Sequence, residues 1–322
     1  MRAALLFFLA LLPVSTSPLL VAQNCPVPPV LQPLAPGLDI FSDAQESDLG
    51  DAMAEQIAPR LKIIENDVLT DYLRVLGNRL VRHLPPNKLN FRFYLVELSE
   101  PNAYSIAGGR VYISRKMIAF AHNEDELAGV IAHELGHIVT HQSGIEMSRR
   151  FREVLGVTQV GDRADIFAKF HQYLENYRRK SIRADSGDKE QAMADQVGLF
   201  TAYRSGYSTQ AFVDVLDRLV ETHGQTGSWF TDVFGISNSQ QRRMRGVMKS
   251  LGALPPGCAE ERTASSAEAF AKWKEKIVAY SGADSEEVLP GLIYRTALKQ
   301  PLRPDISNFR FSADGKVPAR AG

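Results

Sequence analysis

Two histidines and one glutamate stand at a spacing that could hold a metal ion and activate water. They are His133, Glu134 and His137, in the pattern His-Glu-x-x-His. On a helix, residues four apart lie on one face, so the two imidazoles could hold one Zn²⁺ from the same side. Glu134 could take a proton from a water molecule at that ion. The motif therefore predicts one Zn²⁺ per chain, with Glu134 as the general base.

The residues around this motif favour a buried helix over residues 123–141. Asn123 and Glu126 can form a capping pair at its start. Apolar side chains then recur at helical spacing, at Leu127, Ile131 and Leu135. A chance match of the motif on an ordinary core helix is the alternative at this point.

The flanking sequence predicts a mostly helical α+β domain with a small sheet or hairpin beside this helix. Alternation favours a strand over residues 91–97. Two further alternating runs flank Gly108-Gly109 and predict a hairpin over residues 102–113. Helical periodicity favours helices over residues 46–57, 67–83, 115–121, 165–180, 190–205, 210–221, 240–251 and 264–280.

The first residues resemble an export signal. Arg2 precedes an apolar run, residues 3–12, that is too short to span a bilayer, so we expect residues 1–22 to be a signal peptide cleaved after Ala22. An uncleaved N-terminal anchor is the alternative. No later stretch is long and apolar enough to span a membrane. We therefore expect an exported protein, periplasmic or extracellular, with association at a membrane surface left open.

Composition divides the rest of the chain. We expect a proline-rich leader over residues 23–40, a metallopeptidase-like domain over residues 41–253, a helical extension over residues 254–298 and an irregular tail over residues 299–322. Lys plus Arg and Asp plus Glu both number 37, so nothing indicates a nucleic-acid-binding face. The sequence does not indicate an oligomeric state.

Only two cysteines are present, Cys25 and Cys258. Both remain after cleavage at Ala22, and in an oxidising compartment they could pair. A strain-free bridge across so long a loop could stabilise the fold by about 4–5 kcal/mol. Two free thiols are the alternative, because the sequence gives no geometry for the pair.

The hairpin and the motif helix together resemble a known family. Residues 102–142, NAYSIAGGRVYISRKMIAFAHNEDELAGVIAHELGHIVTHQ, are similar to the core of the HtpX and CAAX-prenyl-protease zinc metallopeptidases, metallopeptidase family forty-eight. The resemblance runs over about residues 41–251 and, without later spanning helices, is to the secreted BepA-like branch. It implies a zincin-type fold and a polypeptide substrate that pairs, in extended form, with the strand after the glycines.

The resemblance also implies a third metal ligand from the pattern Glu-x-x-x-Asp. Ala194-Asp195 fits its end, so Asp195 is the residue expected to orient a ligand histidine. Gln191 stands where the glutamate belongs, and Glu190 lies one position earlier. Three interpretations follow: a local irregularity brings Glu190 to the metal, Gln191 binds through its amide oxygen, or the site has decayed. We take Glu190 as the predicted ligand.

A second departure from the family lies downstream. Ser237 stands where the family often has a histidine, whereas Arg243 fits the arginine that follows and is a candidate cleft residue. His141 could share a face with His137, although such a histidine is more often partly buried in a core. Three tyrosines could donate to an oxyanion, but their spacing is more typical of core residues: Tyr177, Tyr203 and Tyr207.

Two functions from different classes fit these residues. The leading hypothesis is an exported zinc metalloendopeptidase that hydrolyses extended or misfolded envelope proteins. The competing hypothesis is a catalytically impaired protease-like domain that binds unfolded chains or an assembly partner through the same cleft. The departures at Gln191 and Ser237 favour the second hypothesis, and the intact Glu134 favours the first.

Overall fold

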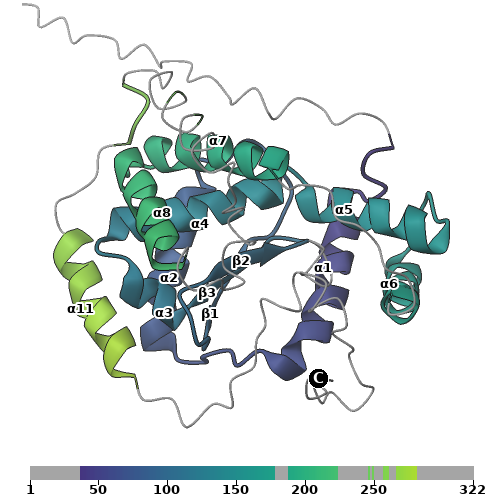
Figure 1. The fold of residues 1–322 in the computed structure, drawn as a ribbon, viewed down its shortest axis with the longest axis horizontal. Coiled ribbons are helices and arrows are strands. Elements are labelled where there is room, and N and C mark those ends of the chain that lie inside the picture. The colour runs from purple at the N-terminus through teal and green to yellow at the C-terminus, as the bar shows by residue number, and fades with distance from the viewer. Residues whose placement is uncertain are drawn as a thin grey trace, which may run out of the picture.

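The fold is described from a computed structural model, which covers residues 37–177, 188–223, 257–260 and 266–280, with Gly246 and Lys249 (Figure 1). The expected signal peptide, residues 23–36 of the leader and the tail over residues 299–322 lie outside the described residues. So do Arg243, Ser237 and almost all of the helix expected over residues 240–251.

The sheet has three strands in the order β1-β3-β2. The strands are β1 (Arg92–Val96), β2 (Ala103–Ile106) and β3 (Arg110–Ser114). The predicted hairpin is present as β2 and β3, which pair antiparallel across Gly108 and Gly109. Both glycines have positive φ angles, 72° and 85°, a conformation that costs glycine little.

One expectation about the sheet is wrong. The strand after the glycines, β3, does not form the edge beside the motif helix. It is the central strand, because β1 pairs with it in parallel on its other side. The strand beside the motif helix is β2, which among the described residues pairs only with β3.

A ladder of tyrosines fixes the register of the sheet. Tyr94 and Tyr104 lie opposite Tyr112 on either side. The ring centroids of both neighbouring pairs are 4.9 Å apart, with interplanar angles of 17° and 11°. Aromatic pairs opposite one another on a sheet face stabilise that pairing. The strand predicted over residues 91–97 is confirmed as β1, which occupies five of these residues.

The helices match the expected periodicity, with shifted ends. α1 begins three residues before the expected start because Ser42 and Gln45 form a capping box there. A π-helical turn, Phe151–Leu155, links α5 to α6. The helices are α1 (Asp43–Ile57), α2 (Asp67–Val81), α3 (Arg115–Phe120), α4 (Glu124–Val139), α5 (Gln142–Arg150), α6 (Arg163–Tyr177), α7 (Asp188–Arg204), α8 (Thr209–His223) and α11 (Ser266–Ala279), with a 3₁₀ turn at Ala58–Arg60.

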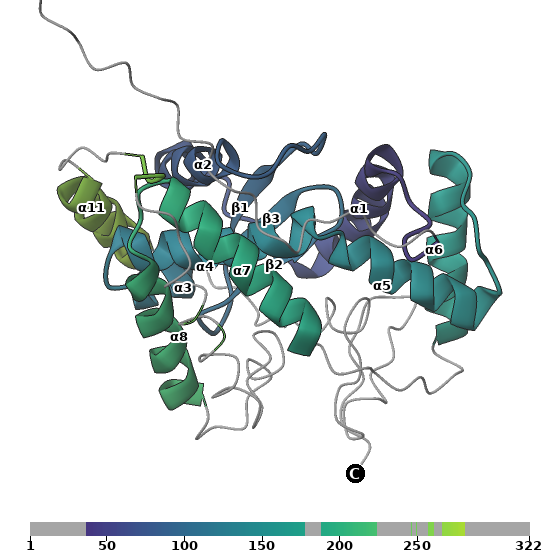
Figure 2. The ribbon, with the colours of Figure 1, turned by 90° about the horizontal axis from the view of Figure 1, so that it is seen from above.

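The two faces of the sheet pack against different helices. Side chains such as Leu95 and Val111 face a core shared with α2, α4, α8 and α11. Side chains such as Val96 and Ile106 face a second core shared with α1 and α6. α4, which carries the motif, contacts β2 on one side and α7 on another (Figures 1 and 2). None of the described helices is both long and apolar enough to cross a bilayer.

Helix α11, from the expected C-terminal extension, packs into the same core as the motif helix. The Trp273 indole donates from Nε1 to the Leu69 carbonyl at 2.7 Å and stacks on Tyr72 with ring centroids 4.6 Å apart. Phe270 and Ile277 on the same helix are also buried there.

Cys258, which precedes this helix, is buried and disulfide-bonded. The sequence offers one other cysteine, Cys25, which lies outside the described residues.

Candidate active site

The start of α4 is fixed by polar contacts. The Asn123 side chain accepts from the Glu126 backbone N–H at 2.9 Å and caps the helix. The carboxylate of Glu126 is held in turn by two hydrogen bonds from Arg218 of α8, at 2.8 and 2.6 Å. Bidentate pairs of this kind give geometric specificity as well as attraction. They set the position from which the motif residues project two turns later.

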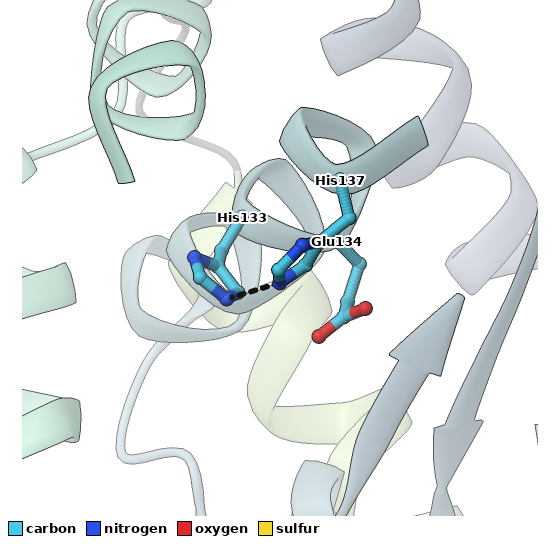
Figure 3. Close-up of side chains that lie close together, drawn as sticks. All are labelled: His133, Glu134 and His137. Carbon is cyan, nitrogen blue, oxygen red and sulfur yellow. Dashed lines mark hydrogen bonds between the residues drawn. The ribbon is translucent and has the colours of Figure 1, made fainter. Parts of the chain in front are cut away.

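The two motif imidazoles converge inside the protein. The Nε2 atoms of His133 and His137 are 3.0 Å apart, and the rings are nearly perpendicular (Figure 3). Both side chains are buried, with exposed fractions of 0% and 3%. Two nitrogens that share a tetrahedral Zn²⁺ with bonds of about 2.0–2.1 Å stand about 3.3 Å apart. The two imidazoles therefore fit a zinc ion if the distance between their Nε2 atoms increases by about 0.3 Å.

The far nitrogen of each imidazole is held by another side chain. His133 Nδ1 lies 3.0 Å from Asp195 Oδ1, and both groups are buried. His137 Nδ1 contacts the amide oxygen of Gln142. Such contacts orient a metal-binding imidazole and fix which nitrogen carries its proton. They leave both Nε2 atoms directed at the same point.

Glutamate 134 lies beside this pair and is buried, with 2% of its surface exposed. A carboxylate oxygen of Glu134 lies within 4.8 Å of a ring nitrogen of each histidine. The hydroxyl of Ser105, on β2, donates to Glu134 Oε2 at 2.8 Å and contacts the Glu134 carbonyl at 3.1 Å. The carboxylate is thereby held on the sheet side of the imidazoles (Figure 3).

Two glycines let α7 approach α4 closely enough for the Asp195 contact. A Cβ at Gly136 would lie 2.5 Å from the Ala194 carbonyl oxygen, and one at Gly198 would lie 2.9 Å from the His133 backbone. Any side chain at either position would force the helices apart. The Gly in the His-Glu-x-Gly-His segment therefore serves helix packing as well as the motif.

The third-ligand candidates lie in the first turn of α7. Gln191 is 2% exposed and, four residues before Asp195, shares the face that meets α4. The side chain of Glu190 lies outside the described residues, so its role as a ligand stays a prediction. Glu190 precedes Gln191 by about 100° of helical rotation.

The remaining candidates lie elsewhere. His141 is bonded to Glu46 of α1, through Nδ1 and Oε2 at 2.9 Å, rather than directed at the imidazole pair. Tyr207 is buried in the core, with the Arg79 guanidinium 5.4 Å from its ring centroid. Tyr203, on α7, is only half-buried, and the Tyr177 side chain lies outside the described residues.

Sequence reasoning missed Gln142 and Ser105. Ser105 belongs to the segment that carried the family resemblance, and alternation along β2 places it on the face of Ala103, toward α4. Gln142 follows the end of α4, where helical periodicity no longer applies. Its contact with His137 depends on the left-handed backbone of His141, at φ 54°.

Comparison with known proteins agrees with this site. Residues 69–228 match the model of peptidase family M48. The beta-barrel assembly-enhancing protease of Yersinia pestis is 30% identical over 187 residues, 55% of this chain and 38% of that protein. Its namesake in Escherichia coli (strain K12) is 29% identical over 191 residues, 56% of this chain and 39% of that protein. The mitochondrial metalloendopeptidase OMA1 of Schizosaccharomyces pombe is 22% identical over 181 residues, 56% of this chain and 50% of that protein.

The family match covers the part of the chain that builds the site. The chain spans only 38% and 39% of the length of the two bacterial relatives. The matched family region contains β1, β2, β3 and α4, together with α7. The chain therefore contains a zincin-type domain of peptidase family M48, over residues 69–228.

Proposed function

We propose that this chain is a zinc metalloendopeptidase. The observation that carries the proposal is the buried Glu134 carboxylate held beside two converging imidazoles. A Zn²⁺ ion held by His133 and His137 would supply Lewis-acid assistance to the attack of water on a peptide carbonyl. Glu134 accepts the proton of the attacking water and then passes it to the leaving amine.

The other candidate residues support this chemistry. Asp195 and Gln142 hold the two imidazoles in place. Glu190 completes the metal site with a carboxylate, and Gln191 is the alternative donor from the same turn. Arg243 is retained as a candidate cleft residue on the family pattern alone.

We propose an extended polypeptide as the substrate. β2 lies at the edge of the sheet beside Glu134, and an added peptide strand could pair with its backbone while its scissile bond faces the motif helix. The names of the bacterial relatives refer to the assembly of β-barrel proteins. That naming supports extended or misfolded envelope proteins as the substrate class here.

The proposed activity is tested by metal content and chelation. We expect the purified mature chain to carry one Zn²⁺ at the motif and to hydrolyse casein. Incubation with 1,10-phenanthroline should abolish hydrolysis, and added Zn²⁺ should restore it. Without the ion, the two imidazoles cannot assist the attack of water on the peptide carbonyl. Zinc is measured by atomic emission and hydrolysis by release of labelled peptides. A chain that binds unfolded casein without cleaving it, with or without Zn²⁺, would instead be the impaired binding domain.

We also propose export of the chain, followed by cleavage after Ala22. The expected result is one mature form that begins near Gln23, because the apolar run of residues 3–12 is too short to remain as an anchor. We expect no lipid at Cys25, because Gln23 and Asn24 precede it where a lipidation signal has small residues. N-terminal sequencing and intact mass of the exported protein measure this. Acylation at Cys25, or a mature chain that retains Arg2, would contradict it.

A further inference from the structure

A second group of metal-binding side chains lies at the far end of α4. Asp39 precedes α1, Glu46 lies on α1, and His141 lies in the turn between α4 and α5. One ligand atom from each lies within 4.8 Å of the other two. α1 crosses the start of α5 at this point, where Gly144 leaves room for the carboxylates (Figures 1 and 2).

The hydrogen bonds of this group leave two carboxylate oxygens directed at each other. Asp39 Oδ1 accepts from the Phe41 N–H at 2.9 Å and from the Ser148 hydroxyl at 3.1 Å. Glu46 Oε2 faces His141 Nδ1 at 2.9 Å. Glu46 Oε1 is buried and accepts no hydrogen bond from a donor among the described residues; the group beside it is the Asp39 carboxyl, with which it could share a proton. A Cβ built at Gly144 would clash with both Glu46 Oε1 and Asp39 Oδ2, so these two oxygens pack side by side against this glycine.

The group has one imidazole to balance two carboxylates, of which Glu46 is buried and Asp39 half-buried. Burial raises the pKa of Glu46 to about 7, although His141 donates to it and lowers that pKa in part. Burial raises the pKa of Asp39 as well. The hydrogen bond to Glu46 raises the pKa of His141, so this imidazole is the local counter-charge. Two carboxylates so close either share one proton, which leaves a single negative charge, or stay ionised together with a cation between them.

We propose that Asp39, Glu46 and His141 bind a second divalent cation, separate from the motif site. One imidazole nitrogen and two carboxylate oxygens are a donor set that suits Zn²⁺ or Mn²⁺. In tetrahedral geometry, two ligands of one such ion with bonds of about 2.0–2.2 Å lie about 3.3–3.6 Å apart. The three ligand atoms lie within 4.8 Å of one another, so side-chain movements of about 1 Å would bring them to that spacing. Asp39 and His141 are only half-buried, which gives an ion a path from solvent.

An ion bound here would stabilise the turn between α4 and α5, which is followed by Gln142. His141 holds the left-handed conformation, φ 54° and ψ 29°, that starts α5, and Gln142 follows it. Because Gln142 contacts His137, the second ion would join the N-terminal segment and α1 to the turn that orients a motif imidazole. The proposed second site is therefore structural, and ion binding there does not depend on catalytic activity.

The test compares Zn²⁺ stoichiometry in matched full-length variants. Glu46→Gln removes one carboxylate charge of the group, and Glu55→Gln makes the same change at an exposed position of α1. The chain with His133→Ala and His137→Ala lacks the motif imidazoles. We expect that chain to bind one equivalent of Zn²⁺ in isothermal titration, with at least a tenfold loss of affinity on adding Glu46→Gln and none on adding Glu55→Gln.

The same comparison in the otherwise native chain keeps the proposal testable if the doubly substituted chain does not fold. Glu46→Gln should then lower the bound zinc by one equivalent relative to Glu55→Gln, and should remove part of the rise in unfolding temperature that Zn²⁺ causes. Equal stoichiometry in the two variants overturns the second site. Failure of the proposed peptidase would appear separately, as no zinc lost on replacing His133 and His137.

Discussion

Replacing Glu134 by glutamine should abolish most peptide hydrolysis and leave zinc binding intact. The amide has nearly the same shape, and its oxygen can still accept from the Ser105 hydroxyl, which lies 2.8 Å from the carboxylate. Unlike a carboxylate, an amide cannot take a proton from water at neutral pH. General-base catalysis contributes about 10²–10⁴-fold, so we expect kcat to fall by about that factor.

The measurement is single-turnover cleavage of a fluorogenic peptide alongside zinc content of the same samples. Glu55→Gln, an identical change at an exposed position, serves as the control and should leave both quantities unchanged. Cleavage by Glu134→Gln at the native rate would show that Glu134 is not the base. Loss of zinc together with activity would assign Glu134 to the metal site instead.

Helical spacing was enough to predict the motif helix, and the family resemblance pointed to the residue that contacts His133. The His133 and His137 imidazoles share a face because they lie four residues apart. The contact of His133 with Asp195 followed from a family pattern, and two glycines make it sterically possible. These features depend on local periodicity or on short patterns, which a single sequence carries.

The contacts that sequence reasoning missed join distant segments through irregular backbone. The sequence favoured a partly buried His141 over one that shares the face of His137, and the structure confirms this, because α4 ends at Val139 and His141 adopts a left-handed conformation. The partner that holds it could not be read from the sequence. Its partner, Glu46, lies 95 residues earlier. The central place of β3 was missed for a similar reason, since parallel pairing with β1 is a non-local choice that alternation does not reveal.

The third metal ligand should largely determine how tightly the domain binds zinc. The first turn of α7 offers two donors, and helix geometry separates their directions by about 100°. Gln191 lies on the buried face that carries Asp195, and it is a neutral donor. Glu190 offers a carboxylate, which binds Zn²⁺ more strongly, but it needs a distortion of the first turn to reach the same point.

We expect Glu190→Ala to lower zinc affinity by about 10–100-fold, or about 1.4–2.8 kcal/mol. Gln191→Ala should change the affinity little and controls for loss of buried side-chain volume in the same turn. Gln191→Glu should have only a modest effect, because a second carboxylate beside Glu190 adds repulsion along with a donor. Competition titration of Zn²⁺ against a chromophoric chelator measures all three variants and the native chain.

The opposite pattern would reassign the site. Unchanged binding in Glu190→Ala, with a gain of tenfold or more in Gln191→Glu, would mean that Gln191 occupies the ligand position and that the native site lacks its carboxylate. Hydrolysis that rises with zinc occupancy in Gln191→Glu would then identify the native chain as a weakened peptidase. Hydrolysis that stays absent despite full zinc occupancy would place the defect outside the ligand set and favour a peptide-binding role for the domain.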